Sequence, residues 1–189
     1  MSPSATEPEG PKSRLGRVLV SGAAIAERVR AMGAEIGKDH AGRTLHVVIV
    51  LEGAGVFGAD LARAIAPGVD VKLHFVRASS YGQGTCSSGR VRVNGGGSLA
   101  LADSHVLLVD DIVDSGRTAR LLLDRLHRAG PRSVRFAALL SKPSGRVVEV
   151  RVDYYGFEIP DEFVVGYGMD HAGAFRDLPD IRVLVPAPF

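Results

Sequence analysis

Three aspartates and a turn of small residues lie in one short stretch of the chain, residues 105–122 (HVLLVDDIVDSGRTARLL). Asp110 and Asp111 follow an apolar run, and Asp114 comes directly before Ser-Gly-Arg-Thr. Free backbone N–H groups at the start of a helix, together with the helix dipole, favour a bound phosphate. Carboxylates beside a phosphate would repel it, so we expect them to face sugar hydroxyls or Mg²⁺. The simpler alternative is a cluster of helix-capping residues, because Asp, Ser and Thr are common wherever a helix begins.

The residues of this turn differ in what they can contact. Ser115 and Thr118 supply hydroxyl groups, and Gly116 lets the backbone approach a ligand closely. Adjacent side chains on a strand point to opposite faces, so Asp110 and Asp111 can have different roles.

The elements around the turn predict an α/β fold. Strands are predicted within residues 44–55, 69–78, 105–110 and 133–142, and helices within 21–39 (with Ser21 as N-cap), 56–67 and 118–130. Such alternation predicts a central parallel sheet flanked by helices. Ligands of these sheets bind beyond the carboxyl ends of the strands, which is where the 110–118 turn lies.

Composition limits the class of protein. The formal net charge is only +2 and no run of Lys and Arg reaches five, which argues against a nucleic-acid partner. No apolar run approaches the ~18 residues of a membrane helix, and the six histidines have no zinc-ligand spacing. The single cysteine, Cys86, fits a reducing compartment, so we expect a cytoplasmic protein with a disordered tail at 1–14.

Four stretches together carry a family resemblance: residues 50–61, 79–93, 106–119 and 154–179. Over about residues 15–185 the chain resembles the hypoxanthine-guanine phosphoribosyltransferases, members of the type I phosphoribosyltransferase family. The stretch 154–179 discriminates best because it looks like the purine-binding hood of this family, which orotate and adenine enzymes lack.

The resemblance implies one phosphoribosyltransferase domain at 15–189. Its core would span about 40–142, and its hood would combine about 15–22 with 143–189; a flexible lid hairpin completes it. The implied reaction transfers the 5-phosphoribosyl group from phosphoribosyl pyrophosphate (PRPP) to N9 of hypoxanthine or guanine, giving IMP or GMP. Mg²⁺ is the implied cofactor, PRPP and a 6-oxopurine are the implied substrates, and a homodimer or homotetramer is expected.

The resemblance also assigns roles within the acidic turn. Asp110 and Asp111 match the pair at the ribose hydroxyls and at the metal, and Asp114 matches the catalytic general acid/base near purine N7. The 5′-phosphate loop matches four residues that act largely through backbone N–H groups: Ser115, Gly116, Arg117 and Thr118.

The base-binding residues are assigned in the same way. Lys142 matches the lysine that donates to the purine 6-oxo group, Tyr154 the stacking aromatic, and Tyr155 a backbone contact to the base edge. Asp161 matches a carboxylate at Mg²⁺, and Arg176 an arginine near pyrophosphate.

Two loops complete the assignment. Ser80 and Tyr81 match a Ser-Tyr pair in the lid, whose closure would exclude water from the ribosyl cation. Gly53 lies in the matched pyrophosphate loop, but Glu52 stands where the family usually carries Lys or Arg. Three roles for Glu52 stay open: contact with Mg²⁺ through water, an ion pair with Arg176, or a place in a subunit interface.

Other functions remain as alternatives. The first is a xanthine-preferring phosphoribosyltransferase, which the sequence does not separate from the main prediction. The second is an RNA-binding regulator on the same fold, which the near-neutral charge and the purine-type tail disfavour. A receiver-type signalling domain fits poorly, because the early strand ends in LEGAG rather than in acidic residues.

Overall fold

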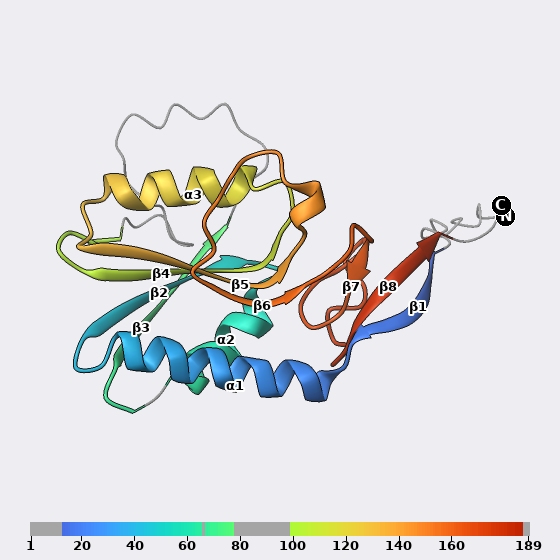
Figure 1. Cartoon of the computed structure of the whole chain (residues 1–189), viewed down its shortest axis with the longest axis horizontal. Helices are drawn as coiled ribbons and strands as arrows, with labels where there is room; N and C mark the ends of the chain where they lie inside the picture. Colours follow the sequence, from blue (N-terminus) through green and yellow to red (C-terminus); the bar gives the residue numbers. More distant parts are fainter. Residues whose placement is uncertain (1–12, 66, 78–98, 187–189) are drawn as a thin grey trace, which may run out of the picture.

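The computed structural model describes residues 13–65, 67–77 and 99–186. Its central sheet has five parallel strands in the order β3-β2-β4-β5-β6 (Figure 1). These strands are β2 (Thr44–Leu51), β3 (Asp70–Arg77), β4 (His105–Val113), β5 (Ser133–Ser141) and β6 (Tyr154–Glu158). The predicted parallel α/β fold is confirmed.

Helices cover both faces of this sheet. In Figure 1, α1 (Gly22–Asp39) and α2 (Gly55–Ala64) lie on one face, and α3 (Arg117–Arg128) lies on the other. Helix α1 begins at its predicted N-cap, where the Ser21 hydroxyl accepts a hydrogen bond from the Ala24 N–H. A short 3₁₀ turn, Pro143–Gly145, follows β5. The helices leave the carboxyl ends of the strands free for a site.

The packing of strand β2 explains why the carboxyl ends of the central strands are held firmly in place. Its residues alternate between two hydrophobic clusters, because successive side chains point to opposite faces. Val47 and Ile49 pack with Phe57 on the α1/α2 side, whereas Val48 packs with Leu122 on the α3 side. Burial on both faces predicts the continuous apolar run seen in its sequence.

A second, antiparallel sheet joins the two ends of the described chain. Its order is β1-β8-β7, from β1 (Ser13–Val20), β8 (Ile181–Pro186) and β7 (Val164–Val165). In Figure 1 this sheet lies beside the carboxyl-end edge of the central sheet. The N- and C-terminal segments of the described chain therefore meet in one small sheet; this sheet, with the loops that join β6 to β8, is called the hood below.

Two expected boundaries differ from the structure. Strand β6 belongs to the central sheet, although residues 143–189 were assigned to the hood, and β1 already begins at Ser13, inside the expected tail. Both strands take their place through pairing with strands distant in sequence, β6 with β5 and β1 with β8, which a local pattern does not reveal. The lid residues Ser80 and Tyr81, and also Cys86, lie outside the described residues. None of the helices in the described ranges is both long and apolar enough to cross a membrane.

Candidate active site

A pocket of about 560 Å³ lies where β2, β4 and β5 end and the hood begins. Its walls come from four segments: Glu52 and Gly53; Asp111, Ile112 and Asp114; Lys142; and the hood residues Phe163, Val164, Met169, Asp170 and Arg176. A smaller pocket of about 280 Å³ adjoins it at the start of α3, lined by residues that include Asp110, Ser115, Gly116 and Thr118. The acidic turn separates the two hollows.

The paired aspartates have different environments, as their places on a strand require. Strand β4 continues past them to Val113, and Asp110 is only 7% exposed. Asp111 lines both pockets and packs directly against the loop after β2. A Cβ added to Gly53 would lie 2.1 Å from Asp111 Oδ2, so that loop approaches the carboxylate as only glycine allows.

Burial changes the acidity of this pair. Burial and then the neighbouring charge of Asp111 raise the pKa of Asp110 well above its ordinary value. Burial also raises the pKa of Asp111, although a hydrogen bond from Asp110 and the positive charge of Arg176 oppose the change. Hydroxyl donors or a cation beside the pair would stabilise its ionised form.

The turn before α3 is held by backbone contacts. Gly116 is the N-cap of α3 with φ of 81°, and a Cβ there would lie 2.3 Å from the Val148 carbonyl oxygen. The N–H groups of Val147 and Val148 both donate to the Ser115 carbonyl. Since the first N–H groups of a helix lack intrahelical partners, this rigid turn can bind a phosphate. Arg117 and Thr118 lie exposed at the start of the helix.

Arg146, which was not predicted from the sequence, holds the same turn in place through hydrogen bonds. Its guanidinium donates to the Asp114 carbonyl at 3.1 Å and to the Ser141 hydroxyl at 3.0 Å. It thereby joins the end of β5 to the acidic turn.

Lys142 and Asp114 come together at the base of the larger pocket. Lys142 is 6% exposed, and its Nζ lies 3.7 Å from Asp114 Oδ2 and 3.4 Å from Asp161 Oδ1. Asp161, expected at a metal, instead pairs with Lys142, and it is outside the residues that line the pocket. The pocket carboxylate from this part of the chain is Asp170.

The assignment of Tyr154 as the stacking aromatic is wrong. Tyr154 is 2% exposed in the hydrophobic core, and its hydroxyl donates to Asp39 at 2.7 Å. Burial, with the Asp39 carboxylate, raises the pKa of this phenol. Tyr154 pairs with Ala137 at the amino end of β6, whereas ligands bind at carboxyl ends. Tyr155 is 50% exposed, and its carbonyl accepts from Arg28 rather than facing the pocket.

The aromatic wall of the pocket is Phe163, which sequence analysis missed. Its side chain is 55% exposed, and its ring meets His171 edge-on with centroids 5.5 Å apart. Its carbonyl accepts from the Leu184 N–H at 2.8 Å, which anchors it to β8. Its position in the sequence could have indicated this role. Phe163 follows the carboxyl end of β6, where ligands bind, whereas Tyr154 lies at the amino end of the same strand.

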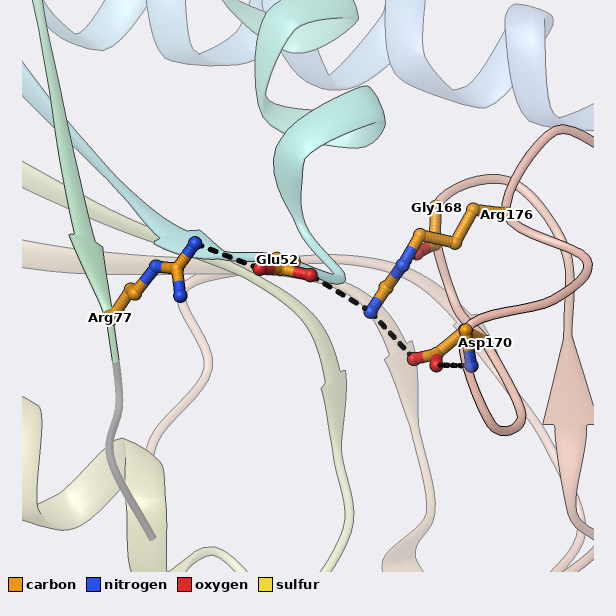
Figure 2. Close-up of polar contacts among 6 residues, drawn as sticks. Glu52, Arg77, Gly168, Asp170 and Arg176 are labelled. Carbon is orange, nitrogen blue, oxygen red and sulfur yellow. Dashed lines mark hydrogen bonds and ion pairs between the residues drawn. The ribbon is translucent and has the colours of Figure 1, made fainter.

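Glu52 lies at the mouth of the pocket between two arginines. The peptide from Leu51 to Glu52 is cis. Glu52 Oε1 lies 2.9 Å from an Arg77 terminal nitrogen, and Oε2 lies 3.3 Å from one of Arg176 (Figure 2). Of the roles left open for Glu52, the structure shows the ion pair with Arg176.

A parallel sheet that ends in an acidic turn, a helix start that can bind a phosphate and a hood beside the pocket is the arrangement that the sequence resemblance predicts. A family model described as the phosphoribosyl transferase domain matches residues 19–172, and the chain belongs to the phosphoribosyltransferase family.

Individual relatives narrow the class. The chain is 42% identical over 168 residues to the hypoxanthine-guanine phosphoribosyltransferase of Streptococcus pneumoniae strain R6, covering 89% of this chain and 92% of that protein. It is 41% identical over 170 residues to the bifunctional protein TilS/HprT of Listeria monocytogenes, covering 90% of this chain. The chain spans only 26% of the length of that bifunctional protein.

Solved structures agree with this placement. A hypoxanthine-guanine phosphoribosyltransferase from Bacillus anthracis has a TM-score of 0.81 and 36% identity, covering 92% of this chain and 99% of that one. An enzyme from Leishmania tarentolae in complex with GMP has a TM-score of 0.79 and 36% identity, covering 92% and 98%. The resemblance inferred from the four sequence stretches is confirmed.

Proposed function

We propose that this protein transfers the 5-phosphoribosyl group from PRPP to N9 of hypoxanthine or guanine, releasing pyrophosphate and forming IMP or GMP. The observation that carries the proposal is the pairing of Lys142 with Asp114 in a pocket walled by Phe163. These three side chains offer a cation, a carboxylate and an aromatic face to one planar base. Named relatives of similar length support the same activity.

The sugar phosphate would bind at the acidic turn. The first N–H groups of α3, with the helix dipole, would hold the 5′-phosphate. Asp110 and Asp111 would accept hydrogen bonds from the ribose hydroxyls, so that their burial is offset by ligand donors. Arg146 and the Ser115 carbonyl contacts keep the turn in one conformation, which reduces the ordering needed on binding.

The base would bind between the hood and β5. The Lys142 ammonium is a hydrogen-bond donor without acceptor capacity, so it favours a 6-oxo group over a 6-amino group. Phe163 would stack on the purine, and the backbone of Val164 would meet the base edge. Asp114 would exchange a proton at purine N7 as N9 bonds to the sugar, which limits charge build-up on the base.

Mg²⁺ is proposed as the cofactor, with Asp111 and Asp170 as its protein ligands. Within the described residues no three His, Cys, Asp or Glu side chains gather to hold a metal alone. That donor set suits Mg²⁺, which commonly uses one or two carboxylates together with substrate phosphates. The ion would neutralise charge on the diphosphate leaving group.

A pyrophosphate-release assay with PRPP and Mg²⁺ tests the proposal. Hypoxanthine, guanine, xanthine, adenine and uracil are offered separately, and we expect release with hypoxanthine and guanine. Preference for xanthine would replace the base assignment alone. Silence with all five bases would contradict the enzyme, and a salt titration of RNA binding would then test the regulator alternative. The expected homodimer or homotetramer is measured by light scattering on the same preparation.

A further inference from the structure

The Glu52 carboxylate is held by guanidinium groups from two separate elements. Arg77 is the last residue of β3, and Arg176 belongs to the hood (Figure 2). Each carboxylate oxygen meets a different arginine, at 2.9 Å and 3.3 Å. Arginines converge in this way on bound carboxylates and phosphates, so Glu52 occupies the place of an anionic ligand.

The two arginines depend on Glu52 to different degrees. Arg176 also pairs with Asp170 at 2.8 Å and donates to the Gly168 carbonyl at 2.6 Å, so its position has other supports. Within the described part of the chain, the ion-pair partner of Arg77 is Glu52. Glu52 therefore occupies the Arg77 guanidinium that a bound anion would otherwise contact.

The charge of the pocket disfavours an unaided diphosphate. Among the described residues that line it, four are carboxylates (Glu52, Asp111, Asp114, Asp170) and two are cationic, Lys142 and Arg176. The ion pairs at the mouth are solvated, with side-chain exposures of 52% for Glu52, 63% for Arg77 and 32% for Arg176. Exposed pairs of this kind are weak, so a multiply charged ligand can exchange with the carboxylate.

We propose that Glu52 is an internal competing anion, and that the diphosphate of the substrate displaces it from Arg77 and Arg176. Both guanidinium groups then bind diphosphate oxygens, so Arg77 joins Arg176 as a diphosphate-binding residue. Glu52 lowers the affinity for PRPP and for pyrophosphate, and its return to the arginines favours release of pyrophosphate. This inference rests on the proposed function and adds to it a residue that sets diphosphate affinity.

Calorimetric titration with pyrophosphate in the presence of Mg²⁺, at low ionic strength, tests this role. Glu52→Gln keeps the size of the side chain and removes its charge, and we expect about three- to tenfold tighter pyrophosphate binding. Glu35→Gln, an exposed change on α1 with the same loss of charge, is the matched control and should leave the affinity unchanged. GMP, which carries no diphosphate, should bind wild-type protein and Glu52→Gln alike.

The Arg77→Gln variant completes a double-mutant cycle. We expect Arg77→Gln to weaken pyrophosphate binding with either residue at position 52, and the gain from Glu52→Gln to shrink when Arg77 is absent. Unchanged or weaker binding by Glu52→Gln would overturn the inference, as would wild-type protein that binds no pyrophosphate. If wild-type protein forms IMP and Glu52→Gln fails to tighten binding, only this inference is wrong. If no base yields a nucleotide, the proposed function itself fails.

Discussion

The two ends of the proposed active site differ in the atoms that form them: main-chain groups at one end and charged side chains at the other. At the phosphate end, the turn before α3 is held by main-chain hydrogen bonds to Ser115 and by the close approach of Gly116 to Val148. At the proposed diphosphate end, partly or fully exposed side chains from three segments meet through ion pairs around Glu52. A site formed by main-chain atoms is disturbed mainly by changes that move the backbone. Exposed ion pairs contribute little to stability, so their side chains can change without disturbing the fold. This difference explains how an acid can replace the usual cation at position 52 while the fold is unchanged.

The largest expected effect is at Asp114, where the two ends meet. Asp114→Asn keeps the shape of the side chain but removes the proton acceptor, so we expect kcat to fall by about 100-fold or more with the melting temperature retained. Steady-state assays with guanine measure this change. Asp124→Asn, on the exposed face of α3, serves as the control. Wild-type turnover in Asp114→Asn would reject the acid/base role.

The second largest effect is expected from a change at Gly116, in the turn that main-chain contacts hold before α3. Gly116→Ala would bring a Cβ to 2.3 Å from the Val148 carbonyl oxygen at a φ of 81°, so we expect GMP to bind about tenfold or more weakly. The left-handed backbone alone costs about 1 to 2 kcal/mol of stability for a residue with a Cβ.

Gly130→Ala separates the backbone strain from the clash. Gly130 also has a positive φ, 75°, but among the described residues no atom beyond its chain neighbours lies within 4 Å of the added Cβ. We expect this control to lose stability but not GMP affinity, as measured by thermal melting and calorimetry. Equal loss of GMP affinity in both variants would mean that the clash at Val148 is irrelevant.

A smaller effect on kinetics is expected from a change to Phe163, a side chain that lines the pocket. Phe163→Leu keeps an apolar contact but removes the stacking face, so we expect KM for hypoxanthine to rise about fivefold. Tyr155→Leu, which replaces a similarly exposed aromatic outside the pocket, should leave KM unchanged. The opposite pattern in the two kinetic measurements would reject Phe163 as the stacking aromatic.

The smallest effect concerns the stability of the buried acid pair. Because folding raises the pKa of Asp110 above its ordinary 3.8, the native state binds this proton more tightly than the unfolded state. The resulting stability is full below the ordinary pKa and is lost as pH rises through the folded pKa. We therefore expect Asp110→Asn to be more stable than wild type at neutral pH, with a flatter pH dependence.

Urea unfolding at several pH values measures this difference. The amide oxygen of Asn can still accept from the Asp111 N–H, as Asp110 does at 3.1 Å, so the local hydrogen bond is kept. Activity should fall in the same variant, since the acid pair is retained for the ligand rather than for folding. A variant less stable than wild type at neutral pH would contradict this account.

Local patterns were sufficient for the central strands, for α1 with its Ser21 cap, and for the acidic turn. Each of these depends on contacts between residues close in sequence or on continuous burial, which periodicity reports directly. Strand β6 and the hood strands were harder to predict, because their positions depend on pairing with other strands rather than on a local pattern. The assignment of Tyr154, made from the family resemblance, failed for this reason: the sequence around it did not show which end of β6 lies at the pocket.

The sequence by itself determined the class of fold, the turn of small residues before α3, and the presence of Glu52 at a position where the resemblance predicts a cation. Those properties depend on residue types and on spacings of a few residues. Only the tertiary structure decided that Phe163 and Asp170, rather than Tyr154 and Asp161, wall the pocket, and that Glu52 lies between Arg77 and Arg176. Pairs such as Glu52 and Arg176 are 124 residues apart, and the direction of a side chain across that separation is set by packing rather than by local sequence.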